Sequence, residues 1–189
     1  LDIADGFGLG DSDPGFTLTG DIFVDGANSE FIVNWYVELD ITGDIIVTSG
    51  GHVFMDGDLD LTITGDILLD DSDMETEDGI ITIKGDIDLS TDSNLDIIDT
   101  EYCFVYDGAN IHHYIELNEG TLTANGAEFY GSRATAGDWR GISVTGTAAG
   151  ATLEMDDCEI RDAGGYYNWG AEIWSAALYI GSGAGYFKN

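Results

Sequence analysis

Basic residues are scarce in this sequence of 189 residues, and acidic residues are abundant. Lysine and arginine together number 5, aspartate and glutamate together number 37, and the formal net charge is −32 at pH 7. A surface with this charge repels nucleic acids and anionic membranes, whereas it attracts divalent cations and basic partners. The charge also far exceeds the magnitude of roughly 2–8 that solubility alone favours in a small domain. We therefore expect no nucleic-acid partner, and we expect a halophilic or calcium-rich setting.

Proline, cysteine and long apolar runs are scarce too. The chain has 1 proline and 2 cysteines, and two cysteines do not make a disulfide framework. Cys103 and Cys158 lie in apolar, strand-like contexts, so we expect both to be small core residues. No apolar run approaches the ~18 residues of a membrane span, and the residues of this sequence do not show the pattern of a signal peptide, so we expect no membrane insertion. Because the first residue is Leu1 rather than methionine, we expect a processed N-terminus or a piece of a longer protein.

The tripeptide Gly-Asp-Ile occurs four times, at successive spacings of 23, 22 and 20 residues. The copies occupy residues 20–22, 43–45, 65–67 and 85–87. Each copy follows a segment in which apolar and polar residues alternate: FTLT, LDIT, LTIT and ITIK. This alternation indicates half-buried strands, in which Leu61, Ile63, Ile67 and Leu69, for example, point inward. A period of 20–23 residues is too short for a helical hairpin or a propeller blade, and it matches one coil of a β-solenoid.

A second similarity supports this spacing. The segment Tyr36-Val-Glu-Leu recurs as Tyr114-Ile-Glu-Leu after 78 residues, which is close to four repeats. We therefore predict an all-β fold, a parallel β-helix (β-solenoid) of about nine coils. A single domain over residues 16–189 follows an N-terminal extension over residues 1–15. Since neither end carries an amphipathic capping segment, we expect the solenoid to continue into further chain or to pair with another copy.

Three segments of the second half make the fold prediction more specific. They are TLTANGAEF from Thr121, GDWRGISV from Gly137 and LEMDDCEIRDAG from Leu153. These segments resemble the repeats of right-handed parallel β-helix proteins, the pectin-lyase-like superfamily, of the secreted and cell-surface type. The resemblance covers about residues 110–180 and implies a right-handed coil and an extracellular or cell-surface location. It implies no single activity, because this fold carries lyases, hydrolases, adhesins and inert scaffolds.

The aspartates of the repeated tripeptide form a candidate calcium site. The four side chains at this position are Asp21, Asp44, Asp66 and Asp86. If the coils stack in register, these carboxylates form a column at about 4.8 Å intervals, where they must protonate, splay apart or share a cation. We predict calcium, which accepts flexible oxygen coordination, at this column or at the acidic turn containing Asp70, Asp71 and Asp73. The alternative is that each aspartate caps its own turn through a hydrogen bond, while glycine supplies the positive φ.

Aromatic residues gather in the last quarter of the chain. The candidate contact residues are Trp139, Tyr166, Tyr167, Trp169 and Trp174. If they are exposed, such rings stack on sugars; if they are buried, they close the solenoid or form a subunit contact. We predict a carbohydrate or subunit contact here.

The scarcity of basic residues also weighs against catalysis. Polysaccharide lyases of this superfamily use arginine or lysine, and the related hydrolases use poised carboxylates. The best carboxylate group is Asp156 and Asp157 with Glu128 or Asp99, but the family's catalytic signatures are missing. We therefore predict an extracellular structural or surface protein rather than an enzyme, either a self-assembling filament or layer subunit or an adhesive scaffold. The alternative is a carbohydrate-binding or polysaccharide-cleaving module.

Overall fold

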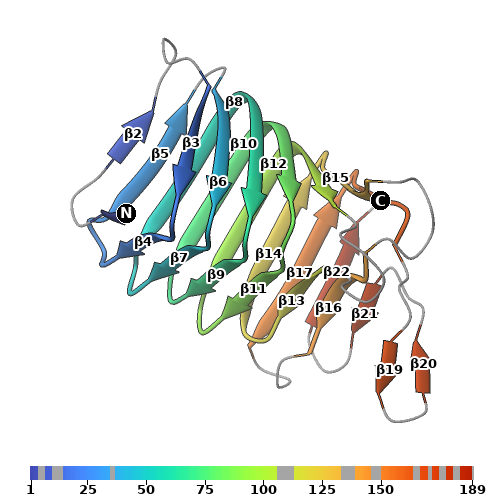
Figure 1. Ribbon diagram of the computed structural model, residues 1–189. Helices are drawn as coiled ribbons and strands as arrows, with labels where there is room; N and C mark the ends of the chain where they lie inside the picture. Colours follow the sequence, from blue (N-terminus) through green and yellow to red (C-terminus); the bar gives the residue numbers. More distant parts are fainter. Residues whose placement is uncertain are drawn as a thin grey trace.

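The computed structural model confirms an all-β architecture built mainly from parallel sheets. It describes residues 1–3, 7–9, 15–34, 37–105, 113–132, 139–145, 150–163, 167–169, 172–174, 178–180 and 184–188. These residues contain strands and no helix, and the chain passes back and forth between two long stacked sheets (Figure 1). This arrangement is consistent with a β-solenoid.

Sheet A is a fully parallel sheet of short strands. In spatial order its strands are β1 (Asp2–Ile3), β4 (Ile22–Asp25), β7 (Ile45–Thr48), β9 (Ile67–Asp70), β11 (Ile87–Ser90), β13 (Tyr114–Leu117), β16 (Gly141–Val144) and β21 (Leu178–Ile180). Each of the four Gly-Asp-Ile copies leads directly into one of these strands, because its isoleucine is the first strand residue.

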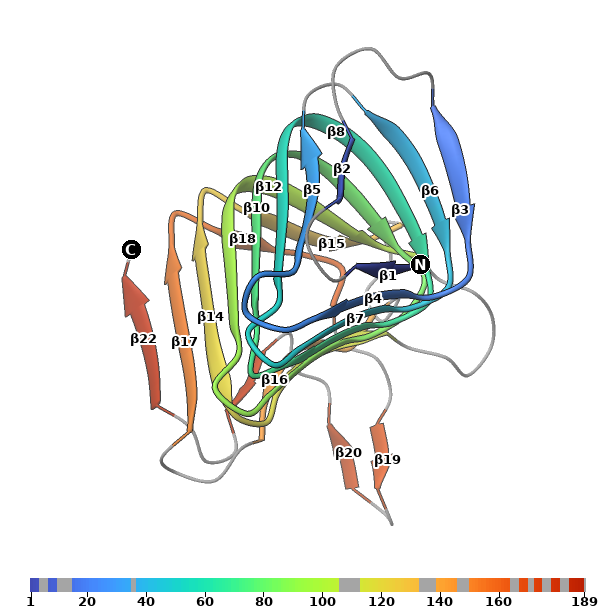
Figure 2. The same cartoon turned by 90° about the vertical axis from the view of Figure 1, so that its left-hand side faces the viewer.

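Sheet B has two arms. The first arm contains β2 (Phe7–Leu9), β5 (Glu30–Asn34), β14 (Gly120–Asn125), β17 (Ala151–Asp156) and β22 (Ala184–Lys188), and the second contains β3 (Phe16–Thr19), β6 (Glu38–Thr42), β15 (Glu128–Gly131) and β18 (Glu159–Ile160). The long strands β8 (His52–Thr64), β10 (Asp73–Ile83) and β12 (Asn94–Phe104) belong to both arms. Asp78 in β10 and Asp99 in β12 have positive φ values of 52° and 46°, which bends each strand between the arms. Viewed along the stack, sheet A and the two arms lie on different sides of a shared interior (Figure 2).

The interior is filled by side chains that repeat in register. One column runs along the start of the sheet A strands, and its members are at most 1% exposed: Ile22, Ile45, Ile67, Ile87, Ile115 and Ile142. Full burial of one such side chain stabilises the fold by about 1.5–3 kcal/mol. The predicted inward residues Leu61, Ile63, Ile67 and Leu69 are all buried, so the alternation assigned these strand faces correctly.

Two details of the sequence interpretation need correction. The segment similar to Tyr114-Ile-Glu-Leu does not occupy an equivalent position, since Glu38 and Leu39 begin β6 of sheet B whereas Tyr114 begins β13 of sheet A. Cys103 is not a core residue: it faces outward between the buried residues Tyr102 and Phe104. Both cysteines are half-buried free thiols.

Strands β1 and β2, which lie in the expected N-terminal extension, pair with β4 and β5 and so add to the two sheets. Within the described part of the chain, we find no helix with the length and apolarity that crossing a bilayer requires.

Candidate functional site

The stacking of repeats brings the four tripeptide aspartates into one column. They occupy the corner where the second arm of sheet B passes into sheet A, and they are Asp21, Asp44, Asp66 and Asp86. We call this column the aspartate ladder. Its position follows from the strand register, which pairs the following isoleucines with one another.

Hydrogen bonds join each aspartate of the ladder to the next. The backbone N–H of Asp44 donates to Oδ1 of Asp21 at 3.0 Å, and the N–H of Asp66 donates to Oδ1 of Asp44 at 2.9 Å. The N–H of Asp86 donates in the same way to Oδ1 of Asp66 at 2.8 Å. At the corner a carboxylate oxygen accepts the hydrogen bond that a main-chain carbonyl accepts inside a strand. The backbone N–H of the next aspartate, which would otherwise be unpaired, is therefore satisfied.

Close approach requires a glycine before three of the four aspartates, because a Cβ at Gly43, Gly65 or Gly85 would overlap the backbone of the preceding repeat. Gly65 has a φ of 150°, and a Cβ at this position would overlap the carbonyl oxygen of Gly43 in the preceding repeat. The backbone N–H of Gly43 in turn donates to the carbonyl of Thr64 at 2.9 Å. The Gly-Asp pair therefore lets successive corners stack at contact distance, which explains why both residues recur together.

The ladder ends at Asp86, where the next repeat has different residues. Oδ1 of Asp86 accepts the backbone N–H of Tyr114 at 3.2 Å and lies 3.3 Å from Nδ1 of the buried His113. The guanidinium carbon of Arg140 lies 5.6 Å from the centroid of the Tyr114 ring, and the backbone N–H of Arg140 donates to the carbonyl of His113. Basic and aromatic groups therefore gather at the end of the carboxylate column.

A pair of carboxyl groups lies beside this end, on the outer face of sheet A. Asp88 in β11 and Glu116 in β13 are directly opposite each other in the strand register. Burial raises the pKa of Asp88 to about 6, and the negative charges of Glu116, Asp86 and Asp66 add to the increase. Glu116 also accepts a hydrogen bond from the Thr145 hydroxyl at 2.7 Å. Sequence reasoning missed this pair because the register of β11 against β13 could not be inferred once Gly-Asp-Ile was lost.

The three aspartates of the acidic turn predicted as a second calcium site lie in three different backbone settings. Asp70 ends β9, Asp71 has a positive φ of 49°, and Asp73 begins β10, where its Oδ1 accepts a hydrogen bond from the Asn94 amide at 2.7 Å. No group of three or more histidine, cysteine or acidic side chains in the described residues is arranged to hold a metal ion. Calcium binding at the ladder or at this turn stays a prediction.

The predicted aromatic contact set is divided by the fold. Trp139 is fully buried, stacks on Phe104 with ring centroids 4.5 Å apart, and donates its indole N–H to the carbonyl of Arg161. Its ring is therefore part of the core. Tyr167 and Trp169 lie in β19 (Tyr167–Trp169) and Trp174 lies in β20 (Glu172–Trp174), which form an antiparallel hairpin. Tyr166 lies outside the described residues.

The carboxylates named as the best catalytic group come from β12, β15 and β17 and from the bend after β17. Asp99 and Asp157 both have positive φ, and the strand register places Gly126 of the intervening repeat between them. Glu128 instead accepts a hydrogen bond from Arg161 at 3.2 Å. The Arg161 guanidinium carbon also lies 4.0 Å from the centroid of the Tyr130 ring, so this arginine stabilises the outer face of β15.

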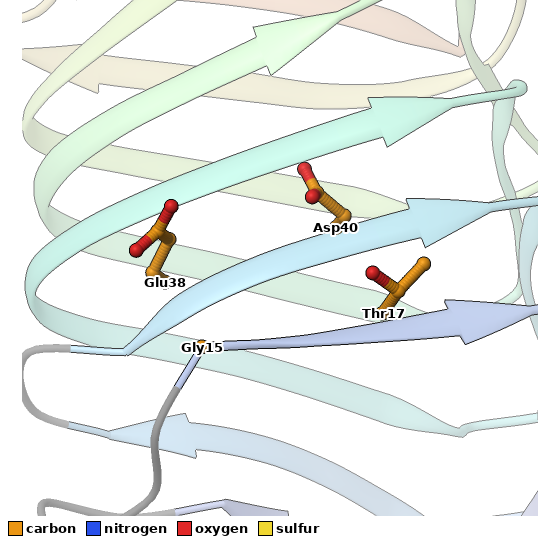
Figure 3. A pocket seen from close by; sticks show the side chains of 4 residues that line it. All are labelled: Gly15, Thr17, Glu38 and Asp40. Carbon is orange, nitrogen blue, oxygen red and sulfur yellow. The ribbon is translucent and has the colours of Figure 1, made fainter.

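A small acidic recess lies on the outer face of the second arm of sheet B. It has a volume of about 180 Å³, and Gly15, Thr17, Glu38 and Asp40 line it (Figure 3). Glu38 and Asp40 project from β6, and Thr17 projects from the neighbouring β3. The recess offers hydroxyl and carboxylate oxygens, but its exposed position gives little shelter from water.

Comparison of the chain with protein-family models, with curated protein sequences and with solved structures found no match. The geometry of the described residues is therefore the basis for assigning a function.

Proposed function

We propose that this chain is an extracellular structural protein, a right-handed parallel β-helix of about nine coils. In this proposal it belongs among the pectin-lyase-like β-helices and works as a subunit of a surface filament or layer, or as an adhesive scaffold. The aspartate ladder carries the proposal. The aspartate carboxylates of the ladder accept N–H···O bonds of 2.8–3.0 Å from the next repeat, so they serve to hold the repeats together.

The charge supports the proposed setting. A net charge of −32 repels itself in dilute salt, and dissolved ions or bound calcium relieve that repulsion. A halophilic or calcium-rich extracellular location would supply such ions. Calcium is the proposed cation because the exposed groups are carboxylate and hydroxyl oxygens, the ligands that this ion prefers.

Assembly is the second part of the proposal. The outermost strands of a parallel sheet present backbone N–H and C=O groups that can pair with strands of another copy. Contact between the two different ends of a solenoid repeats without closing, and so it builds a filament. Copies of this chain would therefore join end to end, and calcium would reduce the repulsion between them.

Electron microscopy and sizing chromatography of the purified chain test this proposal. The protein is compared in calcium, in chelator, and in sodium chloride matched to the ionic strength of the calcium buffer. We expect filaments or sheets in calcium that separate into short rods in chelator. A strictly monomeric particle under every condition would contradict assembly, and assembly that depends only on ionic strength would contradict a specific role for calcium.

One observation favours a second candidate, a carbohydrate-cleaving module. Asp88 and Glu116 are adjacent carboxyl groups, and the pKa of Asp88 is raised to about 6, which suits a general acid. Tyr114 and Arg140 lie beside them and could hold a sugar. Screening of the chain against neutral and acidic polysaccharides tests this candidate. Cleavage that the Asp88→Asn variant loses, while Asp96→Asn keeps it, would favour the enzyme over the scaffold.

A further inference from the structure

The outer face of sheet A carries an apolar stripe in an otherwise acidic molecule. Phe23 in β4, Ile46 in β7 and Leu68 in β9 stand next to one another in the strand register and all point away from the core. Phe23 is 42% exposed, which places it among the most exposed large apolar side chains, and Ile46 and Leu68 are partly exposed. We call these three residues the apolar stripe.

Acidic columns flank the apolar stripe on both sides, because side chains on one face of a strand recur every second residue. On one side are Asp21, Asp44 and Asp66 of the aspartate ladder. On the other side are Asp25, Thr48 and Asp70. Asp25 and Asp70 are exposed, and the Thr48 hydroxyl donates to Asp25 at 2.8 Å. The surface therefore has an apolar centre and anionic borders.

The length of the apolar stripe is also defined. In the next repeat the position opposite Leu68 is Asp88, so the apolar column ends after three residues. Neighbouring strands are about 4.8 Å apart, which places the first and third side chains about 10 Å from each other. An α-helix has a pitch of 5.4 Å, so a helix lying across the strands can place residues at i, i+3 or i+4, and i+7 against the three stripe residues.

We propose that the apolar stripe and its acidic borders bind a cationic amphipathic helix of a partner protein. The helix would place two turns of apolar side chains on Phe23, Ile46 and Leu68, and lysine or arginine side chains on both of its flanks would meet the aspartate columns. Charge complementarity selects this occupant over a second copy of the chain, since each copy carries a net charge of −32 and only 5 basic residues. The proposal does not depend on the scaffold function, because the surface is the same if the chain is an enzyme.

The test uses two synthetic peptides of identical composition. One is a labelled leucine–lysine helix of about four turns with a single apolar face, and the other is a scrambled sequence without such a face. Their binding to the full chain is measured by fluorescence anisotropy at near-physiological ionic strength. We expect the amphipathic peptide to bind at least roughly tenfold more tightly than the scrambled one, because only it buries apolar area on the stripe.

Variants of the chain then locate the binding surface. The triple variant Phe23→Thr, Ile46→Thr and Leu68→Thr keeps strand-forming residues and should weaken binding roughly tenfold. Ile80→Thr is the matched control, because Ile80 is 41% exposed but lies in β10 of sheet B, and it should leave binding unchanged.

The pair Asp25→Asn and Asp70→Asn should weaken binding about threefold and reduce its salt dependence. The pair Asp60→Asn and Asp96→Asn makes the same charge change on exposed sites of sheet B and should have no such effect.

Several outcomes would overturn the proposal. Equal binding of the two peptides, or equal effects of the two aspartate pairs, would mean that the attraction is only the general negative charge. Unchanged binding by a triple variant whose melting curve shows it folded would place the site elsewhere. A dimer in sizing chromatography that the triple variant abolishes would identify a second copy as the occupant.

Discussion

The four Gly-Asp-Ile repeats and the repeats that follow them hold the same corner together by different chemistry. In the first region, over residues 20–87, each corner is bonded to the next by an aspartate carboxylate and a backbone N–H. In the second region His113 and Tyr114 take the positions of glycine and aspartate, and Arg140 follows in the next repeat. At this corner the Arg140 guanidinium lies against the Tyr114 ring.

The two regions also differ in regularity. Ladder partners are separated by 20–23 residues, whereas Asp86 and its partner Tyr114 are separated by 28 residues. The glycine corners, which stack closely, accompany the shorter spacings, and the bulky His113–Tyr114 corner accompanies the longer one. Uniform repeats therefore depend on one small residue and one acceptor at each corner, and the irregular region depends on individual side-chain contacts.

The largest effect should come from filling the glycine corner. Gly65→Ala places a methyl group against the Gly43 carbonyl and keeps an unfavourable φ of 150°, so we expect the free energy of unfolding to fall by about 3 kcal/mol. Gly20→Ala is the control, because its φ is 106° but its Cβ meets nothing within 4 Å, and it should cost about 1 kcal/mol. Urea denaturation measures both, and equal losses would show that stacking contact does not matter.

Removing one acceptor from the aspartate ladder should have the next largest effect. Asp66→Ala leaves the backbone N–H of Asp86 without its acceptor and should destabilise the fold by about 2 kcal/mol. Asp66→Asn keeps an oxygen at the same place and should stay within about 0.5 kcal/mol of the wild type. Denaturation of both variants in low and high salt checks this. If Asn destabilises as much as Ala, the charge rather than the acceptor stabilises the corner.

A smaller, pH-dependent effect should arise at the carboxyl pair beside the end of the ladder. The pKa of Asp88 is raised from 3.8 to about 6, so between these values the folded state binds more protons than the unfolded state. The resulting stabilisation is present below 3.8 and is lost as the pH rises through about 6. Asp88→Asn should therefore be more stable than the wild type above that pH, by about 1 kcal/mol after allowing for solvent screening.

Denaturation curves at a series of pH values check the Asp88 prediction. The advantage of Asp88→Asn should shrink as the pH falls toward 3.8, whereas the control Asp96→Asn, on an exposed site of sheet B, should show no comparable trend. An advantage that is independent of pH would exclude titration of Asp88 as its cause.

The smallest effect should come from the arginine contacts of the second region. Arg161→Gln removes the contact with the Tyr130 ring and the bond to Glu128, and it should destabilise the fold only slightly, because water screens these exposed interactions. Lys84→Gln, which neutralises an exposed cation in the first region, is the control and should have no measurable effect. Thermal melts in low and high salt measure both, and a loss similar to that of Asp66→Ala would contradict the proposed difference between the regions.

The regular region was predictable from the sequence because its periodicity is local and repeated. Alternation of apolar residues identified the inward side chains Leu61, Ile63, Ile67 and Leu69, and the repeated tripeptide placed four aspartates in one column. The bond between them could not be predicted in detail. The alternative to calcium that the sequence offered was that each aspartate caps its own turn, whereas the carboxylate accepts from the next repeat, which depends on how closely the corners stack.

The irregular region was less predictable because its register is set by tertiary contacts. The similarity of Tyr36-Val-Glu-Leu to Tyr114-Ile-Glu-Leu was misleading, since the alternation of a strand is the same in either sheet. Cys103 was predicted to lie in the core, but the alternation of its strand places its side chain on the outer face. Trp139 was predicted to lie on a contact surface, but it stacks on Phe104. A short apolar motif does not specify the face on which a side chain lies.

Each internal aspartate of the ladder donates its backbone N–H to the carboxylate of the preceding aspartate, and its own carboxylate accepts the N–H of the following aspartate. A duplication or deletion of one whole repeat between residues 20 and 87 would therefore leave every corner donor matched to an acceptor. The molecule could lengthen or shorten during evolution in steps of about 4.8 Å without new interactions being needed. Asp86 is instead fitted to His113 and Tyr114, so it marks the boundary beyond which such copying would have to be accompanied by compensating substitutions.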